Sequence, residues 1–424
     1  MKPETIALHA GYDGDPTTHA ATTPIYQTTS FTFDNTQHGA DLFNLAVPGN
    51  IYSRIMNPTN AVLEARLAEL EGGVGALAVA SGMAAIRYAI EAIAEVGCNI
   101  VSTSQLYGGT YNLFAHTFPR QGLETRFADA EDFDRVRSLI DENTRALFCE
   151  SIGNPAGNVV DIEIWAEIAH EAGVPLIVDN TVATPLLCRA FDYGADIVVH
   201  SLTKYIGGHG TTIGGAIVDS GRFDWAAHPE RFSVMTTPDP SYHGVVYTEG
   251  FGDAAFIGRC RVVPLRNTGA ALSPHNAFLI MQGLETLSLR MKQHCKNAKK
   301  VAKYLQVHPQ VTWVNYAGLK DSPYRETCKK ICDGKAAGIL SFGIEGGAEA
   351  GARFIDALQM ILRLVNIGDA KSLACHPAST THRQLNPEEL ASAGVSEDMV
   401  RISVGIEHID DIIADIEQAL AAAK

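Results

Sequence analysis

Three absences narrow the class of protein to which this sequence of 424 residues can belong. It has no apolar run long enough to span a bilayer, and residues Met1–His9 lack the apolar core of a signal peptide. It also has no block of basic residues. The balance of charge is acidic, since 33 Lys and Arg stand against 48 Asp and Glu, a formal net charge of −15. We therefore expect a cytoplasmic protein that binds neither a membrane nor nucleic acid.

Cysteine is scarce and follows no pattern. The eight cysteines are scattered along the chain, which predicts reduced thiols in a reducing compartment. Cys328 and Cys332 are four residues apart on an expected helix and could form half of a metal site. No second pair or nearby histidine completes such a site, so we expect ordinary surface or core thiols and no metal.

The chain lacks internal repeats and low-complexity tracts, and the order of its expected elements divides it into three parts. Residues 1–57 are rich in Thr, Asp, Gly and Asn with little periodicity, which indicates an extended arm. Residues 58–270 begin with a helix to Glu71 and then alternate strands and helices, which predicts an α/β domain with a mostly parallel, helix-covered sheet. Its clearest strands are 76–80, 100–104, 146–150, 176–179 and 197–200. A smaller C-terminal α+β domain is expected over 271–424, with a long helix from 272, strands 339–344, 361–365 and 400–404, and a final helix 409–422.

Lys204 has neighbours that an ordinary surface lysine lacks. An apolar run from Ile197 leads through the hydroxyls of Ser201 and Thr203 to this lysine, and a glycine cluster ending at Gly215 follows it. A lysine at the carboxyl end of a buried strand is partly desolvated, which makes its uncharged amine easier to form. Such amines form Schiff bases with aldehydes, and pyridoxal phosphate is the commonest aldehyde cofactor bound in this way.

A carboxylate and a helix start complete the set of groups that this cofactor needs. Asp179 ends another apolar run 25 residues before Lys204, a spacing that fits two parallel strands joined by a short crossover. Their ends meet at one crevice, so the carboxylate could keep the ring nitrogen protonated while the amine holds the aldehyde. At Ser81 and Gly82 a strand turns into an amphipathic helix, whose first N–H groups can bind phosphate. Each feature alone has an ordinary explanation, and only the combination favours a cofactor site.

With these segments in place, the chain resembles the fold-type I pyridoxal-phosphate enzymes of cysteine and methionine metabolism over essentially its whole length. The segments Asp179–Thr181 and His200–His209 carry the resemblance. It implies that Lys204 forms the Schiff base and that Asp179 pairs with the ring nitrogen. The further cofactor contacts that it implies are Ser81, Gly82, Met83, Ser201 and Thr203 at the phosphate, Tyr107 stacked on the ring and Asn154 beside the ring hydroxyl. Ile152 departs from the family, which usually has proline there.

The resemblance also implies a substrate clamp and a partner subunit. Arg401 matches the arginine that binds the substrate α-carboxylate, and Asn366 lies where the family places another carboxylate contact. Tyr52 and Arg54 match a pair that reaches the phosphate of the neighbouring subunit, which implies a homotetramer built from dimers with shared active sites. The two histidines of the segment 374–382, His376 and His382, are expected to shape the pocket wall rather than to act in catalysis.

Several positions favour the O-acetylhomoserine sulfhydrylase branch of this family. Phe223–Arg266 resembles an insertion of that branch, and Leu272–Leu287 follows its pattern. Asn366 stands where methionine γ-lyases and cystathionine enzymes have serine, and Gly109 stands where methionine γ-lyases have a reactive cysteine. The implied reaction is a γ-replacement in methionine biosynthesis, in which sulfide replaces the acetate of O-acetylhomoserine and homocysteine is formed. Lys204 would move the Cα proton, and Lys204 or Tyr107 would take a Cβ proton.

Other activities remain open at this point. Within the family they are a cystathionine γ-synthase, an O-succinylhomoserine sulfhydrylase or a γ-lyase. From a different class, a nucleotide-binding oxidoreductase also has alternating strands and glycines, but Gly72–Gly75 lacks the glycine spacing of the dinucleotide fingerprint. The sequence names neither the acyl group nor the sulfur donor, which could be sulfide, a small thiol or a carrier protein.

Overall fold

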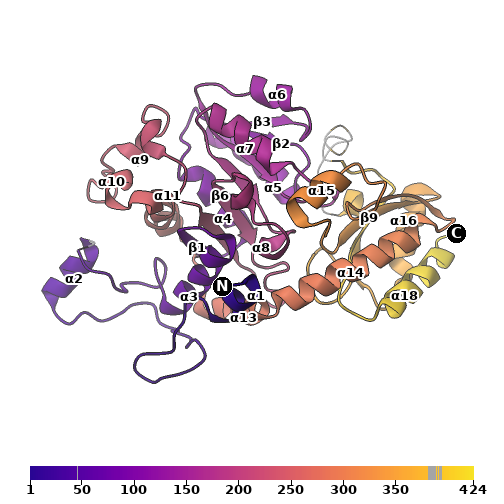
Figure 1. The fold of residues 1–424 in the computed structure, drawn as a ribbon, viewed down its shortest axis with the longest axis horizontal. Coiled ribbons are helices and arrows are strands. Elements are labelled where there is room, and N and C mark those ends of the chain that lie inside the picture. Colours follow the sequence, from indigo (N-terminus) through magenta and orange to yellow (C-terminus); the bar gives the residue numbers. More distant parts are fainter. Residues whose placement is uncertain (45, 381–387, 389, 391–393) are drawn as a thin grey trace.

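The computed structural model describes residues 1–44, 46–380, 388, 390 and 394–424, and it contains two units that are each built on one sheet (Figure 1). The first sheet has seven strands: β1 (Gly75–Val79), β2 (Asn99–Thr103), β3 (Glu124–Ala128), β4 (Thr144–Glu150), β5 (Leu176–Asp179), β6 (Ile197–Ser201) and β7 (Gly215–Asp219). Their order is β1-β7-β6-β5-β4-β2-β3. The neighbours are parallel except at β7, which runs against both β1 and β6.

Helices cover this sheet because its central strands, such as β5 and β6, are apolar and buried. They include α3 (Pro58–Glu71), α4 (Gly82–Glu91), α5 (Gly108–Asn112), α6 (Phe133–Ser138), α7 (Ile162–Glu171) and α8 (Thr184–Leu187). Helix α4 packs against β6 and β7, α3 against β1, and α7 against β4 and β5. Buried β2 and β7 are typical of a sheet that lies between layers of helices. The predicted helix-covered, mostly parallel sheet is confirmed, although strands β3 and β7 were not expected from the sequence.

The second sheet is mixed and lies in the C-terminal part of the chain (Figure 1). Its strands, in the order β10-β11-β12-β9-β8, are β8 (Val311–Asn315), β9 (Ile339–Ile344), β10 (Leu362–Arg363), β11 (Leu373–Cys375) and β12 (Met399–Ser403). Helices α14 (Leu287–Gln306), α15 (Arg325–Cys332), α16 (Gly347–Ala357) and α18 (Ile409–Ala422) accompany it, whereas α13 (Pro274–Glu285) packs on α3 of the first unit. The long helix predicted from 272 is therefore two helices separated at Thr286, and the strand predicted over 361–365 is only two residues long.

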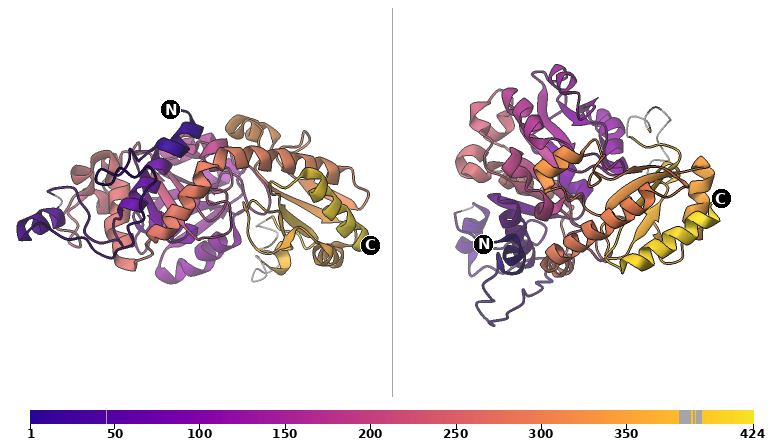
Figure 2. Two further views of the ribbon diagram at one scale, coloured as in Figure 1. Left: turned by 90° about the horizontal axis from the view of Figure 1, so that it is seen from below. Right: turned by 45° about the vertical axis from the view of Figure 1, so that its right-hand side comes forward.

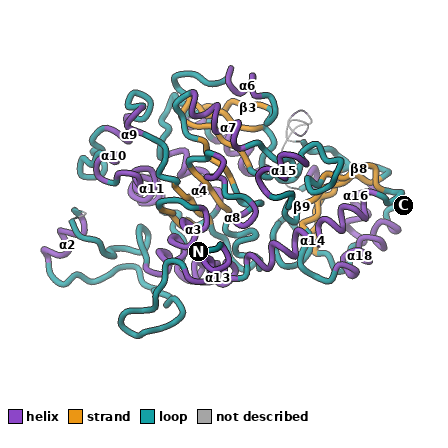
Figure 3. Tube along the Cα trace, viewed as in Figure 1, coloured by secondary structure: helices purple, strands orange, loops and turns teal. Residues whose placement is uncertain are grey.

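Two segments stand outside the layered units. The first 57 residues hold two short helices, α1 (Pro3–His9) and α2 (Thr36–Phe43), joined by long loops (Figure 3). Helix α1 packs on α3, whereas α2 lies away from both sheets in Figure 1 and in the left-hand view of Figure 2. The segment Phe223–Arg266 forms a lobe of short helices, chiefly α9 (Ser233–Thr236), α10 (Tyr247–Gly250) and α11 (Ala255–Cys260), beside β1. Its buried aromatic rings, among them Trp225 and Phe256, stack on one another.

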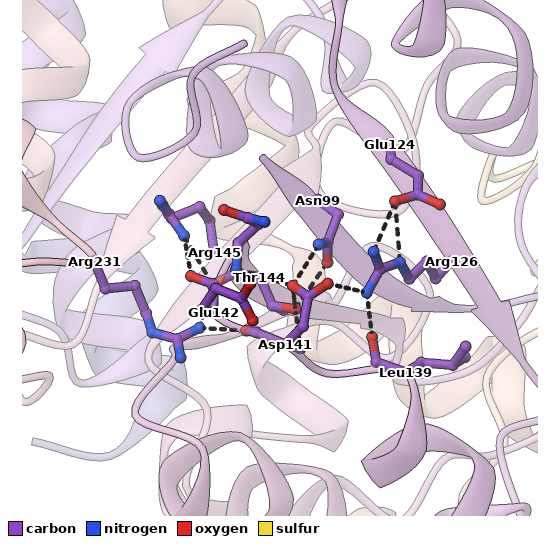
Figure 4. Close-up of polar contacts among 10 residues, drawn as sticks. Asn99, Glu124, Arg126, Leu139, Asp141, Glu142, Thr144, Arg145 and Arg231 are labelled. Atoms are coloured by element: carbon purple, nitrogen blue, oxygen red, sulfur yellow. Dashed lines mark hydrogen bonds and ion pairs between the residues drawn. The ribbon is translucent and has the colours of Figure 1, made fainter. Parts of the chain in front are cut away.

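A cluster of polar side chains that are hydrogen-bonded to one another holds the amino ends of strands β2, β3 and β4 together (Figure 4). The Asp141 carboxylate accepts hydrogen bonds from Asn99 (2.8 Å) and Thr144 (3.3 Å), and its second oxygen pairs with Arg126 at 2.7 Å. Partial burial alone would raise the pKa of Asp141, but the bonds from Asn99 and Arg126 lower it to about 2. Arg231, from the 223–266 lobe, donates to the carbonyl of Thr144 at the same edge. These contacts therefore stabilise the amino edge of the sheet.

All eight cysteines are free and buried, and Cys328 and Cys332 belong to the hydrophobic core. Among the residues that the structure describes, no helix is long and apolar enough to cross a bilayer.

Candidate active site

A cavity of about 210 Å³ opens at the carboxyl ends of β4, β5 and β6, opposite the Asp141 cluster. The start of α4 and the loop after β2 close its sides. Ligands of open parallel sheets bind at this edge, because the strand ends and helix starts converge there. The residues that line the cavity are Ser81, Gly82, Met83, Ile86, Tyr107, Glu150, Ile152, Asn154, Asp179, Thr181, Val182, Ser201, Thr203, Lys204, Ile213 and Ile367.

Lys204 follows β6 and directs its amine across the cavity toward the second unit. The amine donates a hydrogen bond to the side-chain oxygen of Asn366 at 2.6 Å. Burial, and next the positive charge of Arg401, lower the pKa of Lys204 to about 8. About a tenth of this amine is therefore uncharged at pH 7, far more than for an ordinary lysine, and the uncharged form is the one that acts as a nucleophile or accepts a proton.

Two carboxyl groups stand side by side at the ends of β4 and β5. Glu150 and Asp179 are paired in the register of these strands and both line the cavity. Burial raises the pKa of both groups, and the neighbouring Asp179 charge raises that of Glu150 further. The N–H of Thr181 donates to Asp179 at 3.0 Å, and this bond offsets part of the rise for Asp179. A cation placed beside Asp179 would favour its ionised form.

The start of helix α4 faces the end of β6 at the other side of the cavity. Ser81 caps the helix by accepting from the N–H of Ala84 at 3.1 Å, while the preceding N–H groups have no acceptor within the helix. This approach is possible because Gly82 has no side chain: a Cβ there would lie 2.7 Å from the Cβ of Ser201. Ser201 and Thr203 also line the cavity, and the Thr203 hydroxyl donates to the carbonyl of Gly214 at 3.2 Å. Backbone N–H groups, a helix dipole and hydroxyls form a donor set that suits a phosphate.

Arg401 brings a buried positive charge to the edge of the cavity from strand β12. Its guanidinium donates to the Asn154 side chain at 3.1 Å and to the backbone carbonyl of Asn366 at 2.9 Å. Its Nε–H is buried and has no partner within the described part of the chain. A guanidinium has five N–H donors, so a buried arginine with an unused donor fits an incoming carboxylate.

The tyrosine side of the cavity is formed by the loop after β2. Tyr107 is 37% exposed in the single chain, and its backbone N–H donates to Glu150 at 2.6 Å. A Cβ at Gly109 would lie 2.5 Å from the Tyr107 ring, so the ring occupies the space that a side chain at position 109 would need.

The structure gathers most of the residues singled out in the sequence. Nine of them line the cavity: Ser81, Gly82, Met83, Tyr107, Asn154, Asp179, Ser201, Thr203 and Lys204. Arg401 and Asn366 reach its edge through the hydrogen bonds above, whereas Tyr52 and Arg54 lie exposed on the arm, with the guanidinium 5.3 Å from the ring, and do not line the cavity of their own chain. His376 bonds through both ring nitrogens, to Ser379 and to the carbonyl of Glu397, and His382 lies outside the described residues.

Glu150 and Thr181 also line the cavity, but the sequence analysis gave them no role. Glu150 could have been found, because it ends a predicted strand just as Asp179 does. Among the described residues, the cavity lining includes none from the 223–266 lobe.

Comparison with known proteins gives one consistent result. The profile of the Cys/Met metabolism PLP-dependent enzyme family matches residues 4–421. The chain is 52% identical to the homocysteine synthase of Schizosaccharomyces pombe over 99% of this chain and 98% of that protein. It is also 52% identical to the O-acetyl-L-homoserine sulfhydrylase of Leptospira meyeri over 99% and 97%. Among solved structures, it resembles an O-acetylhomoserine (thiol)-lyase from Campylobacter jejuni with N′-pyridoxyl-lysine-5′-monophosphate, with a TM-score of 0.96 and 44% identity over 99% and 100% of the two chains.

Proposed function

Because this chain belongs to the family of Cys/Met metabolism PLP-dependent enzymes, we propose that it is an O-acetylhomoserine sulfhydrylase, which replaces the acetate of O-acetylhomoserine by sulfide and forms homocysteine. The observation that carries the proposal is the full-length identity of about half to relatives with this activity in their names. The fold is that of the fold-type I enzymes and the cofactor is pyridoxal phosphate. A nucleotide-binding oxidoreductase is thereby set aside.

The cavity fits this cofactor in its donor set. Lys204 would hold the aldehyde carbon, Asp179 would face the ring nitrogen, and Tyr107 and Asn154 would contact the ring and its hydroxyl. The phosphate would bind the residues around the start of α4 and the end of β6: Ser81, Gly82, Met83, Ser201 and Thr203. The unused donors of the helix start, the glycine approach at Gly82 and the paired carboxyl groups support this assignment. When bound, the cofactor withdraws electrons from the amino acid and makes its Cα and Cβ protons acidic.

The residues of this chain then have separate tasks. The Lys204 amine takes the proton from Cα, and its pKa of about 8 leaves it able both to accept and to return a proton near neutral pH. Asn366 holds that amine at 2.6 Å on the substrate side of the cavity. Arg401 binds the α-carboxylate with its unused donors and so fixes which bond at Cα faces the amine. Lys204 or Tyr107 takes the Cβ proton before acetate leaves from Cγ.

We also propose a homotetramer of dimers with shared active sites, in which Tyr52 and Arg54 contact the phosphate of the neighbouring subunit. Their exposure on an arm, outside the cavity of their own chain, supports this. Mixing Arg54→Ala subunits with Lys204→Ala subunits should restore activity that neither variant has alone.

Residues 1–57 would then be the arm, 58–270 the cofactor-binding domain and 271–424 the small domain. The buried free thiols support a cytoplasmic location.

The test is a substrate panel on the purified enzyme. O-acetylhomoserine and O-succinylhomoserine are each combined with sulfide, cysteine and methanethiol, and the sulfur products are quantified. The proposal predicts that O-acetylhomoserine with sulfide gives the highest kcat/KM and yields homocysteine. Preferential formation of cystathionine would instead identify a cystathionine γ-synthase, and release of 2-oxobutanoate without a sulfur donor would identify a γ-lyase.

A further inference from the structure

Glu150 is a buried carboxyl group that the proposed chemistry does not use. It lies at the end of β4, lines the cavity and is paired in register with Asp179. Two backbone N–H groups from different loops donate to its two oxygens: that of Tyr107 at 2.6 Å and that of Asn154 at 3.2 Å. A carboxyl group this buried is costly, so its bonds to these loops are the reason to look for a role.

The bonds of Glu150 continue as a chain around the cavity. Asn154, whose N–H binds Glu150, accepts from the Arg401 guanidinium through its side chain at 3.1 Å. Arg401 donates in turn to the carbonyl of Asn366, and the Asn366 side chain accepts from the Lys204 amine at 2.6 Å. One continuous series of hydrogen bonds therefore links the tyrosine wall, the carboxylate clamp and the lysine. It crosses from the seven-stranded to the five-stranded sheet at the contact between Asn154 and Arg401.

We propose that Glu150 is a positioning residue: by binding the N–H groups of Tyr107 and Asn154 together, it sets the place of the Arg401 guanidinium relative to the ring wall and thereby the affinity for the substrate α-carboxylate. The proposal rests on the proposed function in that the substrate is an amino acid. It does not depend on which acyl group or sulfur donor is used.

The chemistry of the side chain explains why a carboxyl group is needed. Each of its two oxygens has lone pairs, so both backbone donors are satisfied. A carboxamide has one oxygen and one NH₂ group, and that NH₂ would meet an N–H donor without accepting from it. Glu150→Gln therefore keeps the volume of the side chain but loses one of the two anchors. Glu150→Asp keeps both acceptors on a shorter side chain and tests the distance.

A matched control exists at the other edge of the same sheet. Asp196 is a buried carboxylate at the amino ends of β5 and β6, and its Oδ2 accepts from the N–H of Leu176 at 2.8 Å and pairs with the ring of His170 at 2.9 Å. Asp196→Asn makes the same chemical change without touching the cavity. Its effect on the melting temperature measures what a lost carboxylate anchor does to stability alone.

The experiment uses the holoenzymes and two ligands, each followed by the change in visible absorption of the bound cofactor. L-Homoserine carries the α-carboxylate, and 3-amino-1-propanol is the same amine without it. We expect Glu150→Gln to raise the Kd of L-homoserine and the KM of O-acetylhomoserine about tenfold, the scale of a weakened charge-assisted hydrogen bond. The Kd of 3-amino-1-propanol and the cofactor content should stay unchanged, and Asp196→Asn should alter neither Kd.

Equal weakening of both ligands, or unchanged L-homoserine binding, would overturn the proposal. So would loss of cofactor or of folding in both Glu150 variants, since Glu150 would then support the fold as a whole. Both dissociation constants are measured without turnover. A wild-type enzyme that binds L-homoserine but makes no homocysteine would therefore refute the proposed function and leave the role of Glu150 to be judged separately.

Discussion

The two edges of the seven-stranded sheet carry polar clusters with opposite character. At the amino edge, Asp141 is bound by Asn99, Thr144 and Arg126, and these bonds lower the pKa of its carboxyl group to about 2. At the carboxyl edge, burial shifts the pKa values the other way: that of Lys204 falls to about 8 and that of Glu150 rises. The charged form is thus stabilised at Asp141 and destabilised at Lys204 and Glu150.

This contrast indicates which groups of the chain remain available to bind a ligand. The Asp141 cluster satisfies its own groups and offers a ligand nothing further. The cavity holds a buried arginine with an unused Nε–H, a helix start with free donors and a lysine that is poorly solvated as a cation. Buried polar groups that lack a hydrogen-bond or charge partner raise the free energy of the unliganded chain. A ligand that supplies these partners recovers that free energy on binding.

The largest effect should come from removing the lysine. Under the proposed function, Lys204→Ala would take away both the covalent anchor and the proton carrier, so kcat should fall by at least about a thousandfold. The borohydride-reducible yellow colour should disappear with it. A variant that kept this colour would show that another amine holds the cofactor.

Arg401→Lys should separate substrate binding from cofactor binding. A lysine retains the charge but cannot give two-point binding, so KM for O-acetylhomoserine should rise about 10- to 100-fold while cofactor content is unchanged. The same substitution at the other edge, Arg126→Lys, should leave KM as it is. If both variants changed KM alike, the two edges would not differ in the way described.

The shifted pKa of Lys204 should be visible in two measurements. The rate at which apoenzyme combines with pyridoxal phosphate should rise about tenfold per pH unit below pH 8 and level off above it. In the apoenzyme the unfolded state binds the extra proton between pH 8 and 10.5, so the free energy of unfolding should rise with pH across that window, by about 3 kcal/mol in total. Lys204→Met should remove this rise in urea titrations. A reconstitution midpoint near 10 would contradict the assigned burial.

The smallest effect of a substitution is expected in the Asp141 cluster at the amino edge of the sheet. Asp141→Asn should lower the free energy of unfolding at pH 7 by about 1–2 kcal/mol, a value reduced for the partial exposure of the pair with Arg126, and should leave kcat and KM unchanged. Because the pKa of Asp141 is lowered on folding, its contribution is present above about pH 4 and is lost as the pH falls toward 2. Altered kinetics in this variant would show that the edges are coupled.

The meeting of Asp179 and Lys204 could be predicted from the sequence better than the contact of Arg401 with Asn154, for a physical reason. Asp179 and Lys204 follow apolar strands that are adjacent in both the sequence and the sheet, so their meeting could be anticipated. The bond between Arg401 and Asn154 spans 247 residues and depends on how the two sheets pack, which no local pattern encodes. Strand β7 is not predicted because its glycine-rich start resembles a loop. The strand predicted over 361–365 is longer than β10 because apolar residues there lie exposed at a sheet edge.

The most direct measurement is the site of the cofactor bond. The purified holoenzyme is reduced with borohydride, digested and mapped by mass spectrometry. We expect one pyridoxyl group per chain, on Lys204. A label on any other lysine, or an unmodified Lys204 in enzyme that remains yellow before reduction, would contradict it.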